Sequence, residues 1–339
     1  MSNLPKHKQT FKRAIFVAIL ALAIPMAPLL IVGGIAGSAS AQGVDIPAIL
    51  SAELEGPPSF ITLQYGHQFK TDVEDGGADM SRDNAFFMGG HRFDVGENTS
   101  LIAIGGYTLH AYNFRGNSNS FYQWDDVHRM VAGGLIGHDL NERWRLIGGA
   151  IYRSWGEGGA DYGDSITGGV VMGFDYHPDQ DFSIGLIVGV FSALEDSVGI
   201  VPIPTMKWKF AEDWRWNIGM VSVFDPGVGT ELNWQVSEDV SLGAGISFQT
   251  RRYRLNDKNR VQGNPPRANR NDDGGVGQES EVPLFLNVKW KPAPKTTIDF
   301  LAGVAFAGNV RVESKTGGRI KDDDYDPAPF AGLKANFLF

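Results

Sequence analysis

Side-chain character alternates with a period of two residues along most of this chain. In residues 240–250 the even positions are mainly apolar, from Val240 to Phe248, whereas the odd positions carry Ser, Gly or Gln. Residues 297–306 show a similar alternation. A β-strand sends successive side chains to opposite faces, whereas a helix would repeat every 3.6 residues. These segments are therefore predicted to be strands with one apolar face and one polar or small-residue face.

Fourteen such segments follow one another, with ends defined to about two to four residues. They are expected at residues 59–70, 83–93, 99–110, 127–138, 143–155, 164–176, 182–192, 200–210, 213–223, 228–236, 239–252, 281–291, 295–307 and 328–339.

The connections between these segments alternate in length. Short polar turns follow every even-numbered segment, whereas most of the other connections are longer and rich in Gly and Asp, with a brief exception at residues 225–227. Transmembrane β-barrels have short periplasmic turns, longer outer loops and an even number of strands. A soluble sandwich has no reason to sort its connections in this way. We therefore predict an all-β, closed, antiparallel, up-and-down transmembrane β-barrel over residues 59–339, with fourteen strands within a range of twelve to sixteen.

Tryptophan placement supports a membrane setting. Of the eight Trp residues, six lie close to the short turns and on the apolar side of their segments. Aromatic side chains collect at membrane interfaces, whereas Trp at the end of a sandwich core is the alternative explanation. The predicted periplasmic aromatic girdle consists of Trp144, Trp208, Trp214, Trp216, Trp234 and Trp290.

The last segment alternates up to an aromatic carboxy-terminus, with Phe337 and Phe339 on the apolar side. This pattern resembles the terminal strand of bacterial outer-membrane β-barrel proteins, and the whole chain is similar in organisation to porin-like barrels of uncharacterised function. The resemblance implies that outer-membrane lipid surrounds the protein. It also implies that the barrel-assembly machinery reads Phe337 and Phe339 as an assembly signal.

The N-terminus predicts export. Basic residues precede an uncharged apolar stretch that ends in the A-x-A sequence of residues 39–41, which is typical of a cleaved secretory signal peptide. Residues 1–41 are therefore assigned as signal peptide and residues 42–58 as a periplasmic segment. Because the apolar stretch is long enough to span a bilayer, an uncleaved anchor is the alternative. The predicted location is the outer membrane of a diderm bacterium.

Composition excludes several classes of function. The chain has no Cys and a net charge of −9, so it contains no disulfide scaffold, no Cys-ligated zinc and no overall basic character for binding nucleic acid. The histidines do not form a His-x-Ser-Asn cluster, and no G-x-S-x-G elbow occurs, so an enzyme is not expected. Acidic runs such as residues 321–326 fit solvated loops better than a cation site. No cofactor is expected.

Charges on the polar side of the segments indicate what the lumen transports. The predicted lumen-lining basic residues are Lys70, Arg145, Arg153, Lys207, Lys209, Arg215, Arg251, Lys289, Lys291 and Lys334. The predicted lumen-lining acidic residues are Asp175, Glu231 and Asp299.

Basic rings favour anions, so the sequence predicts a passive, water-filled channel for small, preferably anionic solutes. A lumen filled by these side chains is the alternative, in which a structural or adhesive barrel acts through its extracellular loops. Many glycines also lie on the inward side. They leave space for a conduit, or they permit the strand bending that closure requires, and both explanations remain open here.

Overall fold

The computed structural model describes residues 58–339 apart from residues 75–77, 117–123, 196 and 257–273. Residues 1–57, which include the predicted signal peptide and periplasmic segment, lie outside the described residues. The described strands are β1 (Ser59–Val73), β2 (Ala78–Gly96), β3 (Thr99–Gly116), β4 (Asp126–Asn141), β5 (Trp144–Glu157), β6 (Ile166–Tyr176), β7 (Phe182–Ser192), β8 (Val198–Ala211), β9 (Trp214–Ser222), β10 (Pro226–Gln235), β11 (Val240–Arg254), β12 (Val276–Ala293), β13 (Thr296–Glu313), β14 (Arg319–Tyr325) and β15 (Ala328–Leu338). A single 3₁₀ turn, η1 (Gly163–Ser165), is also present in the described part.

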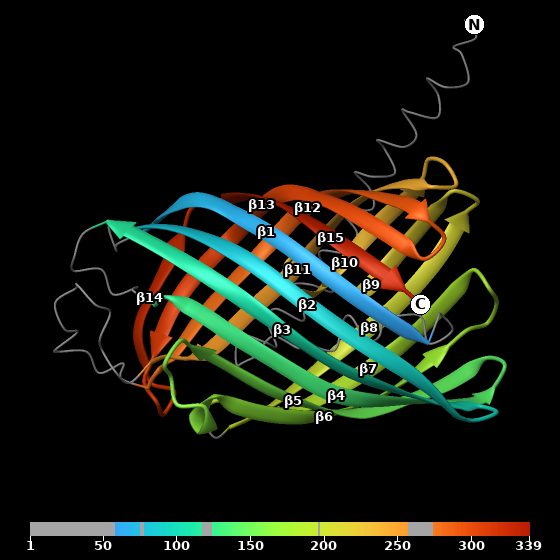
Figure 1. The fold of residues 1–339 in the computed structure, drawn as a ribbon, viewed down its shortest axis with the longest axis horizontal. Helices are drawn as coiled ribbons and strands as arrows, with labels where there is room; N and C mark the ends of the chain where they lie inside the picture. The colour runs from blue at the N-terminus through green and yellow to red at the C-terminus, as the bar shows by residue number, and fades with distance from the viewer. Residues whose placement is uncertain (1–57, 75–77, 117–123, 196, 257–273) are drawn as a thin grey trace, which may run out of the picture.

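The strands form a closed antiparallel barrel (Figure 1). Strands adjacent in sequence pair with each other from β1 to β13, and β15 pairs with both β13 and β1. The closing seam runs from the Phe60–Leu338 pair to the Gln68–Phe330 pair. Closure gives every described ring strand a partner on both sides, which a β-structure within lipid requires. The predicted fold class is confirmed.

Strand β14 adds no further position to the ring. It pairs with β13 and β1, the same two neighbours as β15, so it prolongs the last ring strand beyond Asp326 and Pro327. The ring therefore has fourteen strands. Residues 308–326, expected to be a long connection, instead form most of the β13–β14 hairpin. Other strands also extend beyond their predicted ends, and β12 begins at Val276 rather than at residue 281.

The two ends of the barrel differ. The short turns and the carboxy-terminus lie at the right-hand end in Figure 1, and the longer connections lie at the left-hand end. We call these the turn end and the loop end. In the described part of the chain, no helix is long and apolar enough to cross a membrane.

The outer face carries an apolar band between two aromatic rims. Near the turn end, Trp214 stacks on Trp234 with a centroid separation of 5.8 Å. Towards the loop end, the Tyr107 hydroxyl lies 2.6 Å from Nδ1 of His128 on the outer face. Along β5, Trp144 and Tyr152 belong to the two rims, so the band between them spans about 20–26 Å at a strand rise of ~3.3 Å per residue and the usual tilt. This height matches the apolar band of outer-membrane barrels.

The inner wall is more apolar than the sequence prediction of a polar lumen. Along β2–β8, many inward positions carry buried apolar side chains. They are Met88, Ile102, Ile104, Val131, Leu135, Ile151, Val171, Ile187, Phe191, Val201 and Ile203. Several inward glycines lie under aromatic rings, since a Cβ on Gly169 or Gly189 would overlap Phe191 and one on Gly245 would overlap Phe285. At these positions the space left by glycine is filled by a ring.

Candidate functional site: a latch across the lumen

One hairpin leaves the wall of the barrel and enters the lumen. Strands β9 and β10 are the shortest of the described ring strands, with 9 and 10 residues, and only Val223, Phe224 and Asp225 join them. Pairing between β8 and β9 ends at Met206–Ile218, and the next residue, Gly219, has a φ of 137°. This backbone conformation is accessible to glycine and strained for other residues, so it permits the bend. We call residues 223–225 the latch.

The aromatic residue of the latch packs on the closing seam of the barrel. Gly66 of β1 and Gly332 of β15 face each other as a cross-strand pair. The Phe224 ring lies over them so closely that a Cβ on either glycine would overlap it. Phe330 packs edge-on against Phe224 with a centroid separation of 5.0 Å. The latch therefore reaches from β9 and β10 to the seam between the first and last strands of the ring.

Two glutamine amides hold the backbone of the latch. Nε2 of Gln64 donates a hydrogen bond to the Val223 carbonyl at 2.5 Å, and Nε2 of Gln249 donates to the Asp225 carbonyl at 2.8 Å. Both glutamine side chains are buried. Because a buried carbonyl without a donor is costly, these bonds stabilise the latch in its inward position.

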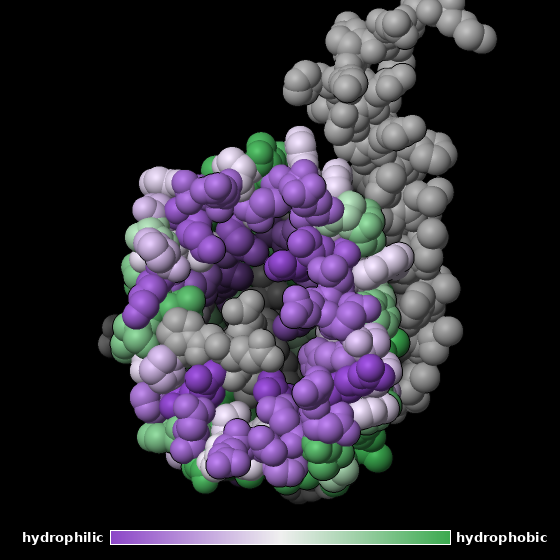
Figure 2. Space-filling model, turned by 90° about the vertical axis from the view of Figure 1, so that its right-hand side faces the viewer, coloured by the Kyte–Doolittle hydropathy of each residue, from purple (hydrophilic) through white to green (hydrophobic). Residues whose placement is uncertain are grey.

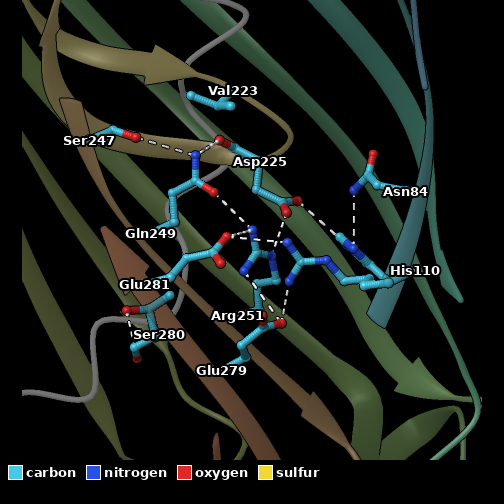
Figure 3. A network of polar contacts seen from close by, with 12 residues as sticks. Asn84, His110, Val223, Asp225, Ser247, Gln249, Arg251, Glu279, Ser280 and Glu281 are labelled. Carbon is cyan, nitrogen blue, oxygen red and sulfur yellow. Dashed lines mark hydrogen bonds and ion pairs between the residues drawn. The ribbon is translucent and has the colours of Figure 1, made fainter. Parts of the chain in front are cut away.

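The carboxylate of the latch lies among basic side chains (Figure 3). Nε of Arg251 donates to Oδ2 of Asp225 at 2.5 Å, and Nη1 of Arg129 donates to Oδ1 at 3.1 Å. Nε2 of His110 lies 3.5 Å from Oδ1, and Nδ1 of His110 is 3.1 Å from the Asn84 amide nitrogen. Asp225 is therefore bound by side chains from β3, β4 and β11.

Two glutamates of β12 extend this cluster. Nη2 of Arg251 donates to Oε1 of Glu281 at 2.7 Å, and Arg82 is hydrogen-bonded to both Glu279 and Glu281. The Tyr112 hydroxyl donates to Glu279 at 2.6 Å. The Tyr325 hydroxyl donates to Glu281 at 2.9 Å. We call Arg82, Arg129, Arg251, Asp225, Glu279 and Glu281 the buried charge network.

The buried charge network is electrically balanced. Its side chains are at most 3% exposed, and its three guanidinium groups face three carboxylates. Charges removed from water are tolerated only when they are paired and hydrogen-bonded. The network and the latch therefore occupy the lumen toward its loop end, where a water-filled passage had been expected from the sequence.

A second cluster of ion pairs and hydrogen bonds lies at the loop end. Arg252 of β11 pairs with Glu195 of the β7–β8 connection and with Glu313 of β13, the latter at 2.5 Å. Nη2 of Arg254 donates to the Leu194 carbonyl at 2.5 Å. Lys315 pairs at 2.5 Å with Asp164 of η1, and its ammonium group lowers the pKa of that carboxyl. These contacts join segments from different sides of the barrel.

The turn end is hydrophilic, and basic side chains on the inward side of its strands are exposed. Figure 2 views this end and shows hydrophilic residues gathered around the rim of the barrel. Lys207, Lys209, Arg215 and Lys291 are exposed here on the inward side of their strands, and Lys289 is half-buried. We call these five residues the basic mouth.

The other predicted lumen-lining residues lie at various depths. Arg153 is buried, with its guanidinium 4.8 Å from the centre of the Phe191 ring. Arg145 pairs with Asp139, and Lys334 lies 3.5 Å from the buried Asp299. The remaining two acids are half-buried, with Asp175 3.7 Å from Nε2 of His177 and Glu231 accepting a hydrogen bond from Asn287.

The side chain of Lys70 does not lie on the lumen side of its strand, where the sequence predicted it. A register shift between Gln68 and Thr71 interrupts the alternation of β1, and the Lys70 side chain is 65% exposed, 2.5 Å from Asp79.

Arg251 is the one predicted lumen residue that belongs to the buried charge network. The six Trp residues of the predicted girdle lie near the short turns and are exposed or half-buried. Phe337 is exposed, and the backbone of Phe339 pairs with that of Ser59.

The sequence prediction missed most of the buried charge network. Arg82 and Glu279 lie just outside the strands predicted at residues 83–93 and 281–291. Arg129 and Glu281 lie within predicted strands on the inward side, so the alternation was sufficient to place them in the lumen. Asp225 was missed because it occupies a connection. Within the described residues, no group of three or more His, Asp or Glu side chains is arranged to hold a metal ion.

The class of protein follows from this geometry. A closed fourteen-strand antiparallel barrel with an apolar outer band, aromatic rims and short turns at one end is a porin-like β-barrel of the outer-membrane type.

Comparisons with known proteins add the following findings. No family model and no curated protein matches the chain. A mutant of the TodX monoaromatic hydrocarbon channel is similar in structure, with 10% identity, a TM-score of 0.49 and coverage of 86% of this chain and 93% of that one. A Pseudomonas aeruginosa FadL homologue has 10% identity, a TM-score of 0.44 and coverage of 84% and 91%. The KdgM porin has 9% identity, a TM-score of 0.32 and coverage of 82% and 99%.

Proposed function

We propose that this protein is a passive channel of the bacterial outer membrane for small solutes, that the latch holds it closed, and that its periplasmic mouth favours anions. The observation that carries this proposal is the contrast between the two halves of the lumen. The turn end has a hydrophilic rim with exposed inward basic side chains, whereas a three-residue hairpin tip crosses the lumen nearer the loop end. A barrel that served only as a rigid support would have no need of exposed charges on the inward side of its strands.

The charge of the mouth supports anion preference. The basic mouth contributes five cationic side chains, four of them exposed. The inward acids Glu231 and Asp299 are engaged with Asn287 and Lys334. Rings of Lys and Arg at a constriction or mouth raise the local concentration of anions.

A change in ion selectivity tests the basic mouth. In an open latch variant, we expect Lys207→Gln/Lys209→Gln/Lys289→Gln/Lys291→Gln to shift the reversal potential in a KCl gradient toward cation selectivity. The matched control replaces Lys70, Arg115, Lys295 and Arg319 with Gln, which removes the same charge at exposed positions outside the mouth. An equal shift in both variants would contradict the assignment of selectivity to the mouth. Absence of conductance from every open variant would contradict the channel itself.

A second function is a structural or adhesive barrel that acts through its extracellular loops. The contacts of Arg252, Arg254 and Lys315 at the loop end favour it, because they hold loop-end segments in fixed positions relative to one another. Planar-bilayer recording separates the two functions, since a permanently closed barrel conducts neither with the latch nor without it.

The proposal includes export to the outer membrane and cleavage of residues 1–41. We expect N-terminal sequencing of the outer-membrane fraction to begin at Gln42. An intact Met1 or Ser2 terminus would favour the membrane-anchor alternative. Assembly by the barrel-assembly machinery through Phe337 and Phe339 is part of the same proposal, because the terminal strand also closes the ring by pairing with β1.

A further inference from the structure

The latch places two adjacent side chains in two separate recesses. Phe224 lies over the Gly66–Gly332 pair, and Asp225 lies among Arg129, Arg251 and His110. These recess residues come from β1, β3, β4, β11 and β15, and not from β9 or β10, the strands that carry the latch. Each recess is therefore built by the rest of the barrel and would persist if the hairpin moved.

The carboxylate recess requires an anion. With Asp225 in place, the buried charge network has three guanidinium groups and three carboxylates. If the latch withdraws, Glu279 and Glu281 remain opposite three arginines, so one positive charge is left without compensation. A buried uncompensated charge is strongly unfavourable. The vacated recess would therefore take up one carboxylate-sized anion, held by Nε of Arg251 and Nη1 of Arg129.

The ring recess requires a flat apolar group. Gly66 and Gly332 expose bare backbone to the lumen, and Phe330 supplies an aromatic edge at 75° to the Phe224 ring. An edge-to-face partner favours an aromatic ring over a chain of the same area. A carboxylate recess and an aromatic recess thus lie within reach of a single molecule.

We propose that these two recesses form a binding site for a phenylalkanoate and that the latch occupies it as an internal stand-in for that ligand. The ligand has a phenyl ring and a carboxylate separated by a flexible spacer as long as the covalent path from the Phe224 ring to the Asp225 carboxyl. Binding competes with the latch and releases it. The inference rests on the proposed function, since it names the solute class that opens the channel.

Calorimetry on the refolded protein tests the site without requiring conductance. The probe is 7-phenylheptanoate, whose spacer has the required length. Heptanoate lacks the ring, and 7-phenylheptan-1-ol lacks the charge. We expect the Phe224→Ala/Asp225→Ala variant to bind the probe at least about tenfold more tightly than the wild type, because the latch no longer competes for the recesses. We expect the variant to bind each control compound at least about tenfold more weakly than the probe.

Three outcomes would overturn the proposal: equal affinity of variant and wild type, equal affinity for probe and controls, and no binding by a folded variant. If the double-alanine protein does not refold, Phe224→Leu/Asp225→Asn, a milder change that still removes the competing ring and charge, takes its place under the same criteria. Gly332→Ala in the variant background adds a Cβ to the ring recess. It should weaken the binding of 7-phenylheptanoate and leave the affinity for heptanoate unchanged. Because these are binding measurements, a barrel that binds the probe but never conducts would overturn the channel proposal alone.

Discussion

Phe224→Ala/Asp225→Asn is expected to raise the open time of the reconstituted barrel by about two orders of magnitude. Loss of a packed Phe ring costs about 3–5 kcal/mol where the space does not collapse, and here that cost falls only on the closed state. The change of Asp225 to a neutral amide also removes the charge that Arg129 and Arg251 bind. A difference of about 3 kcal/mol between two states changes their ratio by roughly a hundredfold. Planar-bilayer recording of single inserted barrels measures the open time of the variant and of the wild type directly.

Matched substitutions on the barrel wall separate latch release from general loosening. Phe191→Ala removes a ring of similar burial from β7, and Asp299→Asn removes a buried carboxylate that contacts Lys334. Neither residue belongs to the latch, so we expect both variants to keep the low open time of the wild type. An increase as large as that of the latch variant would show that any interior cavity opens the barrel. A folded latch variant without added conductance would show that the hairpin is not the barrier.

The sequence was sufficient to predict the architecture because a membrane barrel imposes a local rule. The side chains of each strand must face lipid and lumen in turn. The lipid-facing and lumen-facing sides of residues 240–250 can therefore be predicted from their sequence alone, without knowing which strands pair with them. Fourteen ring strands, their order and the alternation of connections follow from that rule. The strand ends at the loop end do not follow from it, because beyond the membrane no lipid enforces the alternation. For this reason Ala78 and Val276 begin strands several residues before the expected positions.

The site could be predicted only in part, because alternation gives the face of a residue and not its partner across the lumen. Arg251 was expected on the inward side of its strand, yet its pairing with Asp225 joins a strand to a connection, and its pairing with Glu281 joins strands whose predicted limits were uncertain. The sequence signal that could have pointed to the latch is the exception in the loop pattern at residues 225–227. A connection too short to reach beyond the membrane is free to turn inward, and Gly219 supplies the bend.

Arg251→Met is expected to lower the free energy of unfolding by about 3–5 kcal/mol, the largest stability effect anticipated for a single substitution in this protein. Arg251 contacts Asp225, Glu279 and Glu281, and its side chain is fully buried. Its removal leaves three carboxylates with two guanidinium groups, and the loss of one partner from a buried ionic cluster typically costs this amount. Urea unfolding in lipid vesicles, compared with the wild type, gives the difference.

A charge-balanced double variant distinguishes charge imbalance from lost packing. Arg251→Met/Glu281→Gln restores equal numbers of guanidinium and carboxylate groups, so it should be more stable than Arg251→Met alone, despite carrying one more substitution. Arg145→Met is the matched control, because Arg145 pairs with the partly exposed Asp139 near the turn end. The Asp139 carboxylate is 40% exposed and is screened by solvent, so loss of the pair should cost about 1 kcal/mol or less. If the double variant were as unstable as the single one, packing of the Arg251 side chain rather than charge balance would hold the lumen closed. The latch would then be stabilised by shape, and release of Asp225 alone would not open the barrel.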